Sequence, residues 1–276
     1  MTDPISEDLK VRIKAPWEAG DFGAIANSVG APIARDFAMN LEASVAAKIL
    51  DVACGTGGVT IPLARRGFAV TGLDISPKLL SEAQARAASE GLEISFDEGL
   101  IEALPYGDGS FNKVVSLFGI MFSPLPDQAV HEVARVLKPE GGIVLGNWME
   151  AGFSGKMKGV MKPYLPRPKE ESVSPDAWGE ASYVRGRLAP WFNDIETEVV
   201  AAPWLISMPP REAARFFIKC SGQLQLLIPA VGNEKAQALS QVIEELFVVN
   251  NKSNEPRYTL IENMYLRVKA CRNRAS

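Results

Sequence analysis

Short apolar segments alternate with amphipathic segments over residues 48–148, and this alternation constrains the fold more than any other feature of the sequence. The apolar segments predict buried strands at 48–53, 68–73, 93–97, 111–118 and 143–148. The segments between them have the spacing or end signals of helices at 58–66, 76–91 and 127–138. Strands separated by helices of this length predict an α/β fold, in which a parallel sheet carries helices on both faces.

The sequence on either side of this region predicts further parts. Residues 1–45 are expected to form an N-terminal helical cap. Residues 149–191 lose the alternation and are rich in Gly, Pro and aromatic residues, so they predict a lid or substrate insertion of short helices over the carboxyl edge of the sheet. Residues 192–276, with strands expected at 195–200 and 257–270 around two helices, are assigned with 46–148 to the sheet core.

Composition excludes several classes of function. The 276 residues carry a net charge of -4, whereas nucleic-acid and anionic-membrane binders are usually basic. No apolar run is long enough to cross a membrane, and the polar N-terminus does not resemble a secretion signal, so we expect a cytoplasmic protein. The three cysteines do not have metal-ligand spacing, and the chain has a single histidine. Composition therefore excludes a histidine-rich zinc site, and no metal site is predicted.

A glycine-rich turn follows the first predicted strand. Residues 50–58 read Leu-Asp-Val-Ala-Cys-Gly-Thr-Gly-Gly, and glycines at a strand-to-helix turn let a ligand approach the bare backbone. Asp74 ends the next predicted strand, where a carboxylate can accept hydrogen bonds from both hydroxyls of a ribose. Together these features predict a ligand that contains adenosine.

The residues around the turn discriminate between adenosine ligands. The dinucleotide fingerprint has a third glycine where this chain has Thr60, and Asp51 would repel a pyrophosphate. A carboxylate at this place suits a ligand that carries an ammonium and a sulfonium, which is the chemistry of S-adenosylmethionine. A nicotinamide-dependent dehydrogenase is the alternative that Asp51 disfavours.

Four segments then carry a resemblance to the class I S-adenosylmethionine-dependent methyltransferases. They are Asp51–Gly58, Thr71–Ser76, Glu102–Phe111 and Arg135–Gly142, and they occur in the order of the family's motifs. A weaker similarity at Trp17–Phe22 matches an N-terminal segment that covers the cofactor in one small-molecule subgroup. The resemblance implies a Rossmann-like, seven-stranded, mostly parallel sheet with an antiparallel edge.

The resemblance also implies a set of cofactor-binding residues. Asp51, Ala53, Gly55 and Gly57 would surround the methionine part, Asp74 would bind the ribose, and Ile75 would pack on the adenine. The remaining expected cofactor contacts are Trp17, Leu100, Ile101, Glu102, Leu117 and Phe118. Many relatives have Asp at the position of Leu100, so we expect an altered adenine contact there.

The acceptor is expected between the carboxyl edge of the sheet and the 149–191 insertion. Candidate substrate residues are Phe22, Met121, Asn147, Trp148 and Phe153. No catalytic residue is predicted, because His131 shares the solvated side of its helix with Arg135 and Lys138. The function predicted is methyl transfer to a small, partly apolar molecule. The alternative is a cofactor-binding or regulatory protein without turnover.

Overall fold

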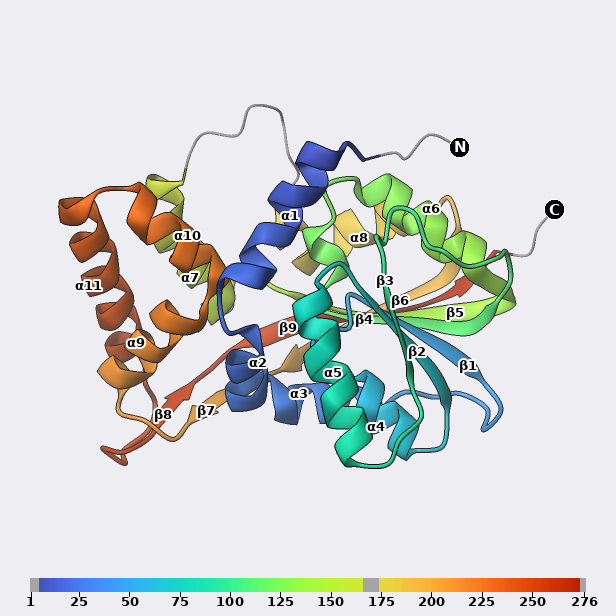
Figure 1. Cartoon of the computed structure of the whole chain (residues 1–276), viewed down its shortest axis with the longest axis horizontal. Helices are drawn as coiled ribbons and strands as arrows, with labels where there is room; N and C mark the ends of the chain where they lie inside the picture. Colours follow the sequence, from blue (N-terminus) through green and yellow to red (C-terminus); the bar gives the residue numbers. More distant parts are fainter. Residues whose placement is uncertain (1–4, 166–173, 274–276) are drawn as a thin grey trace.

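A seven-stranded mixed sheet forms the centre of the computed structural model, which describes residues 5–165 and 174–273 (Figure 1). The strands lie in the order β3-β2-β1-β4-β5-β9-β6. Their bounds are Ser95–Glu98 (β3), Ala69–Asp74 (β2), Lys48–Val52 (β1), Phe111–Leu117 (β4), Leu137–Trp148 (β5), Met264–Arg272 (β9) and Phe192–Ala201 (β6). Strands β3 to β5 pair in parallel and β9 runs antiparallel to both of its neighbours. The fold prediction, including the antiparallel edge, is confirmed.

Helices cover both faces of the sheet because neighbouring strand residues point to opposite sides. The helices beside the sheet are α3 (Ala31–Met39), α4 (Thr60–Arg65), α5 (Pro77–Ser89), α6 (Pro126–Val136) and α8 (Ala181–Leu188). In β4, Val115 belongs to a core cluster that includes α3, whereas Val114 belongs to one that includes α6 and α8. In β1, Ile49 and Leu50 are divided in the same way.

Three helical elements precede α3. They are α1 (Glu7–Ala19), α2 (Phe22–Ile25) and the π-helix η1 (Ala26–Gly30). Ser6 caps α1 by accepting a hydrogen bond from the backbone N–H of Leu9 at 3.3 Å. No residue of α1 is buried, so this helix lies on the surface of the molecule. These elements and α3 lie within residues 1–45, which the sequence assigns to an N-terminal helical cap.

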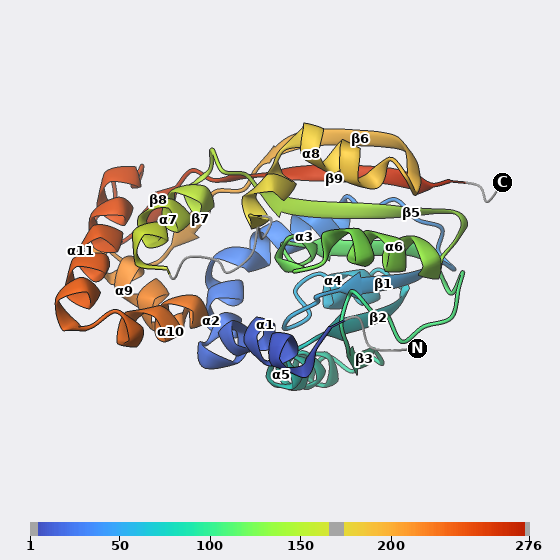
Figure 2. The same cartoon turned by 90° about the horizontal axis from the view of Figure 1, so that it is seen from above.

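A second group of elements, here called the helical lobe, lies beside one end of the sheet (Figures 1 and 2). It comprises α7 (Phe153–Met161), β7 (Trp204–Ile206), α9 (Pro210–Cys220), α10 (Gly222–Ala230), α11 (Asn233–Asn250) and β8 (Thr259–Ile261). Strands β7 and β8 form a separate two-stranded sheet. The sequence assigned residues 204–261 to the sheet core, but the structure places them outside the seven-stranded sheet.

The expected strand at 257–270 is in fact two strands, β8 and β9, separated by Glu262 and Asn263. The side chain of Asn263 is buried and donates to Ser154 Oγ at 2.9 Å. The backbone carbonyl of Asn263 accepts a hydrogen bond from the backbone N–H of Ala202 at 2.8 Å. These bonds divert the chain from one sheet to the other, and a period-two pattern in the sequence gives no sign of that bend.

The predicted insertion at 149–191 divides between the two parts of the molecule. Helix α7 joins the helical lobe, whereas α8 packs beside the sheet with Val184 and Leu188 buried. Three short 3-10 helices complete the described elements: η2 (Ile120–Phe122), η3 (Lys162–Tyr164) and η4 (Pro175–Gly179). Residues 166–173 of the insertion lie outside the described residues.

No helix in the described part of the chain is long and apolar enough to cross a membrane.

Candidate cofactor and acceptor site

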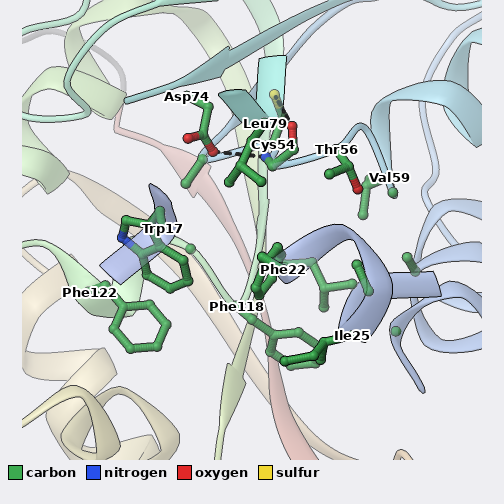
Figure 3. Close-up of a pocket in the computed structure, with 18 of the residues that line it drawn as sticks. Trp17, Phe22, Ile25, Cys54, Thr56, Val59, Asp74, Leu79, Phe118 and Phe122 are labelled. Atoms are coloured by element: carbon green, nitrogen blue, oxygen red, sulfur yellow. Dashed lines mark hydrogen bonds between the residues drawn. The ribbon is translucent and has the colours of Figure 1, made fainter. Parts of the chain in front are cut away.

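A cavity of about 420 Å³ lies among the carboxyl ends of the strands, the N-terminal helices and the helical lobe (Figure 3). This volume is in the usual range for a small-molecule site. The residues predicted from the sequence that line it are Trp17, Phe22, Asp51, Ala53, Gly55, Asp74, Ile75, Leu100, Ile101, Glu102, Leu117, Phe118 and Trp148. Segments far apart in the sequence therefore meet at one site.

The glycine turn places backbone rather than side chains toward the cavity. Ala53 and Gly55 line the cavity with φ angles of 55° each, in the left-handed region that disfavours a side chain. Gly57 has a φ of 77° but does not line the cavity. A Cβ on Gly57 would lie 3.1 Å from Ile61 and 3.4 Å from Ala83. The sequence predicts Gly57 as a cofactor contact, whereas in the structure the space beside it is filled by Ile61 and Ala83.

Asp74 is held at the end of β2 by the turn itself. Its Oδ2 accepts from the backbone N–H of Gly55 at 2.8 Å, the bond drawn in Figure 3, and its Oδ1 accepts from that of Ser76 at 2.9 Å. Only 5% of the residue is exposed. Burial raises the pKa of this carboxyl group, although the backbone hydrogen bonds oppose the shift. The carboxyl group thus has a fixed orientation at the cavity.

Asp51 is a second buried carboxyl group, at the end of β1. Its Oδ2 accepts from the hydroxyl of Thr60 at 2.6 Å. Burial, with a smaller contribution from the charge of Asp74, raises the pKa of Asp51 to about 7. Within residues 5–165 and 174–273, no Lys, Arg or His forms an ion pair with either carboxylate. Two such groups favour a ligand that brings positive charge.

The loop after β3 closes another side of the cavity. The backbone N–H of Gly99 donates to the carbonyl of Asp74 at 3.0 Å and fastens this loop to the end of β2. Leu100, Ile101 and Glu102 follow and line the cavity. Glu102 is buried, which raises the pKa of its carboxyl group, and it accepts a hydrogen bond from the Ser123 hydroxyl. This loop is therefore held by one hydrogen bond to the end of β2 and by another to Ser123, the residue after η2.

Aromatic rings surround the space between the sheet and the N-terminal helices. Trp17 of α1 meets Phe22 edge to face at 5.5 Å and Phe122 at 5.0 Å, measured between ring centroids. Phe118 has a φ of 62° and stacks on Trp148 with centroids 3.6 Å apart. Figure 3 shows Trp17, Phe22, Phe118 and Phe122 around the cavity. These rings give this side of the cavity an apolar boundary.

Three expected substrate residues lie outside the cavity lining. Asn147 precedes Trp148 on β5 and so points to the other face of the sheet, where it is buried. Met121 is buried in the cluster that includes α6. Phe153 packs against Trp204 at 5.3 Å and is also buried. The structure therefore corrects the expectation for Met121 and Phe153, which belong to the apolar core. It also corrects the expectation for Asn147, which is buried outside the cavity lining and whose side-chain amide has no hydrogen-bond partner among the described residues.

The helical lobe supplies cavity residues that the sequence analysis did not identify. They are Ser154, Met157, Lys158, Met161, Trp204, Phe217, Ser221, Gly222, Gln223 and Leu224. Met157 and Met161 follow Phe153 at intervals of four residues, which is a signal for one face of a helix. That spacing predicts a buried face but cannot tell whether the face meets a core or a ligand.

The lone histidine takes no part in the cavity lining. The His131 side chain on α6 is 42% exposed and packs against Trp191 at 4.9 Å. No group of His, Cys, Asp and Glu in the described part of the chain could hold a metal ion. Among the polar residues of the cavity lining, the buried carboxyl groups of Asp51, Asp74 and Glu102 are the ones that favour an organic cation as the ligand.

Known proteins share both the motif region and the fold. A methyltransferase domain family matches residues 49–141. An uncharacterized protein of Mycobacterium tuberculosis is 34% identical over 196 residues, covering 70% of this chain and 72% of the relative. A methyltransferase of Streptomyces halstedii, GfsG, is 38% identical over 115 residues, or 41% of each chain. The YcgJ protein of Bacillus subtilis has a TM-score of 0.58 at 16% identity, over 88% of this chain and all of that one.

The matched family, the sheet order and the carboxyl-lined turn agree with one another. The backbone of the turn permits close approach of a ligand. The two buried carboxylates have no cationic partner among the described residues, and their charge complements that of S-adenosylmethionine. The chain belongs to the class I methyltransferases that use S-adenosylmethionine as cofactor.

Proposed function

We propose that the protein transfers a methyl group from S-adenosylmethionine to a small, partly apolar molecule by in-line displacement. When bound, the cofactor supplies an electrophilic methyl group on a sulfonium. The chain's own residues then hold the two partners in line and keep water away, which are effects that need no protein base. The observation that carries the proposal is the pair of buried carboxylates, Asp51 and Asp74, beside an aromatic-lined cavity.

The proposed cofactor half of the cavity comprises Asp51, Ala53, Gly55, Asp74 and Ile75. Asp74 accepts hydrogen bonds from the ribose hydroxyls with the carboxylate lone pairs that its backbone bonds leave free. Asp51 faces the methionine part, where its charge complements the ammonium and the sulfonium. The backbone at Ala53 and Gly55 permits close approach because a loop in the left-handed region carries few side-chain atoms.

The other cofactor contacts implied by the motifs are also part of the proposal. Leu100, Ile101 and Glu102 border the adenine, and Leu117 and Phe118 lie below the ligand. Trp17 covers it from α1, where it already contacts Phe22 and Phe122. Leu100 cannot accept a hydrogen bond through its side chain, so the backbone of the loop takes over the contact to the adenine edge.

Calorimetric titration with S-adenosylmethionine and S-adenosylhomocysteine tests the proposal. We expect micromolar binding by the wild type, weakened by about 1–3 kcal/mol in Asp74→Ala, because a charged hydrogen-bond partner is removed. Asp74→Asn should lie between them, since it keeps one acceptor oxygen. Asp127→Ala, at an exposed carboxyl group on α6, is the matched control and should bind like wild type. A wild-type protein that binds neither compound would refute the proposal.

A further inference from the structure

The helical lobe contributes one continuous part of the cavity lining, here called the acceptor wall. It consists of Met157 and Met161 on α7, Trp204 on β7 and Phe217 on α9. All four side chains are more than nine-tenths buried. They lie beyond residues 49–141, the part of the chain that the methyltransferase domain family covers. The acceptor wall therefore lies outside the part of the chain that the methyltransferase domain family matches.

Two stacked ring pairs form a rigid corner where the wall meets the sheet. Trp204 stacks on Phe217 with centroids 4.9 Å apart and an interplanar angle of 11°. Trp148 stacks on Phe118 at 3.6 Å and 9°. The two indoles are 6.0 Å apart and nearly perpendicular, at 78°. Each indole is held by a phenylalanine, so the corner keeps its shape without a ligand, and preorganised apolar surface binds flat rings well.

The charge of this part of the cavity differs from that of the cofactor half. Of the lining residues that the described lobe contributes, Lys158 alone is charged. Its ammonium pairs with the carboxylate of Asp176 at 2.5 Å and lies 5.7 Å from the centre of the Phe122 ring. A charged group on an acceptor would lose its water here without gaining a free ionic partner from the described wall, which is unfavourable.

We infer that the acceptor wall selects a neutral molecule with a flat ring system, which packs in the corner between Trp148 and Trp204. The inference rests on the proposed methyl transfer, because it assigns the second substrate of that reaction. A flat ring can contact both indoles and both methionines at once, and methionine adapts its shape to apolar ligands. An acyclic chain of equal size gains fewer of these contacts and loses more conformational freedom.

The test measures binding of acceptor-like probes to the protein saturated with S-adenosylhomocysteine. The probes are 2-naphthol, 6-hydroxynaphthalene-2-sulfonate and 1-decanol, each titrated by calorimetry. We expect 2-naphthol to bind at least about tenfold more tightly than the sulfonate, because the one cation that the described lobe brings to the cavity, Lys158, is already paired with Asp176. It should also bind more tightly than decanol. Equal or tighter binding of either comparison probe, or no binding of 2-naphthol, overturns the inference.

Variants of the wall assign the binding to the corner. Trp204→Ala should weaken 2-naphthol binding about tenfold or more, and Trp204→Phe should restore part of it by keeping a ring against Phe217. Leu205→Ala, at the next and exposed residue of β7, is the matched control. S-Adenosylhomocysteine affinity reports on the fold of each variant and should stay within about twofold, since the wall lies outside the cofactor half. Unchanged naphthol binding in Trp204→Ala overturns the inference.

The two proposals fail in different ways in this experiment. If S-adenosylhomocysteine does not bind the wild type, the proposed function fails. If it binds and 2-naphthol does not, the cofactor site stands and only the assignment of the acceptor fails.

Discussion

The two halves of the cavity are built in different ways. In the cofactor half, backbone amides of one turn and the ends of two adjacent strands position the polar groups, as Asp74 and Gly55 show. In the acceptor wall, side chains of α7 line the same cavity as those of β7 and α9, which follow more than forty residues later in the sequence, as Met161 and Trp204 show. A site made from local backbone geometry leaves a motif in the sequence, whereas one made from distant side chains does not.

Gly119→Ala should produce the largest effect among the changes that separate the two halves. A Cβ at this position would lie 3.0 Å from Ser116 Oγ and closer still to the Cβ of Ala53, which belongs to the cofactor half. The crowding should cost about 1–3 kcal/mol of unfolding free energy and displace the turn, which weakens S-adenosylhomocysteine binding by about tenfold or more. Chemical denaturation and calorimetry measure the two quantities.

Gly159→Ala is the control for that change, because a Cβ on this residue of α7 meets no atom within 4 Å. It should leave cofactor binding unchanged and stabilise the helix slightly, by up to about 1 kcal/mol. If Gly119→Ala bound the cofactor as well as Gly159→Ala does, the turn of the cofactor half would tolerate an added methyl group despite its close packing. The cofactor half would then not depend on exact backbone geometry, contrary to the comparison above.

The same contrast explains what the sequence could and could not predict. Asp51 and Asp74 are predictable because the end of a buried strand fixes where a side chain lies, and a glycine turn follows the strand that contains Asp51. Asn147 was misplaced because adjacent strand residues face opposite sides, and the sequence alone did not show which side held the cavity. The sequence does not predict Trp204, because β7 has three residues and pairs only with β8, the short strand that the bend at Asn263 separates from β9.

The pH dependence of cofactor binding sharpens the comparison, because the acceptor wall has no titratable group whereas Asp51 titrates near neutrality. The pKa of Asp51 is raised to about 7 in the free protein, and a cationic ligand favours its ionised form. Affinity for S-adenosylhomocysteine should therefore rise as the pH increases toward 7, by at most about tenfold per pH unit, and level off above it. Binding of 2-naphthol to the saturated protein should not follow this curve.

The stability of the free protein should change in the opposite direction. A carboxyl group whose pKa is higher in the folded state than in the unfolded state retains its proton on folding, so stability is lost as the pH rises from about 4 to 7. Asp51→Asn should flatten both curves, and Asp127→Asn should leave both as in wild type. A wild-type affinity that is constant between about pH 5.5 and 7.5 would show that Asp51 does not face the charge of the ligand.

The smallest effect is expected at His131, although a lone histidine is the residue that a search for a catalytic base would choose first. Its side chain lies on α6 against Trp191, outside the lining of both halves. His131→Gln should therefore change cofactor affinity and the rate of methyl transfer by less than about twofold, because surface changes away from the site have small effects. A tenfold loss of rate with unchanged cofactor affinity would mean that a protein base acts on the acceptor. In that case positioning of the substrates and exclusion of water would not suffice for methyl transfer. The part of the cavity that holds the acceptor would then depend on a polar side chain, as the cofactor half does.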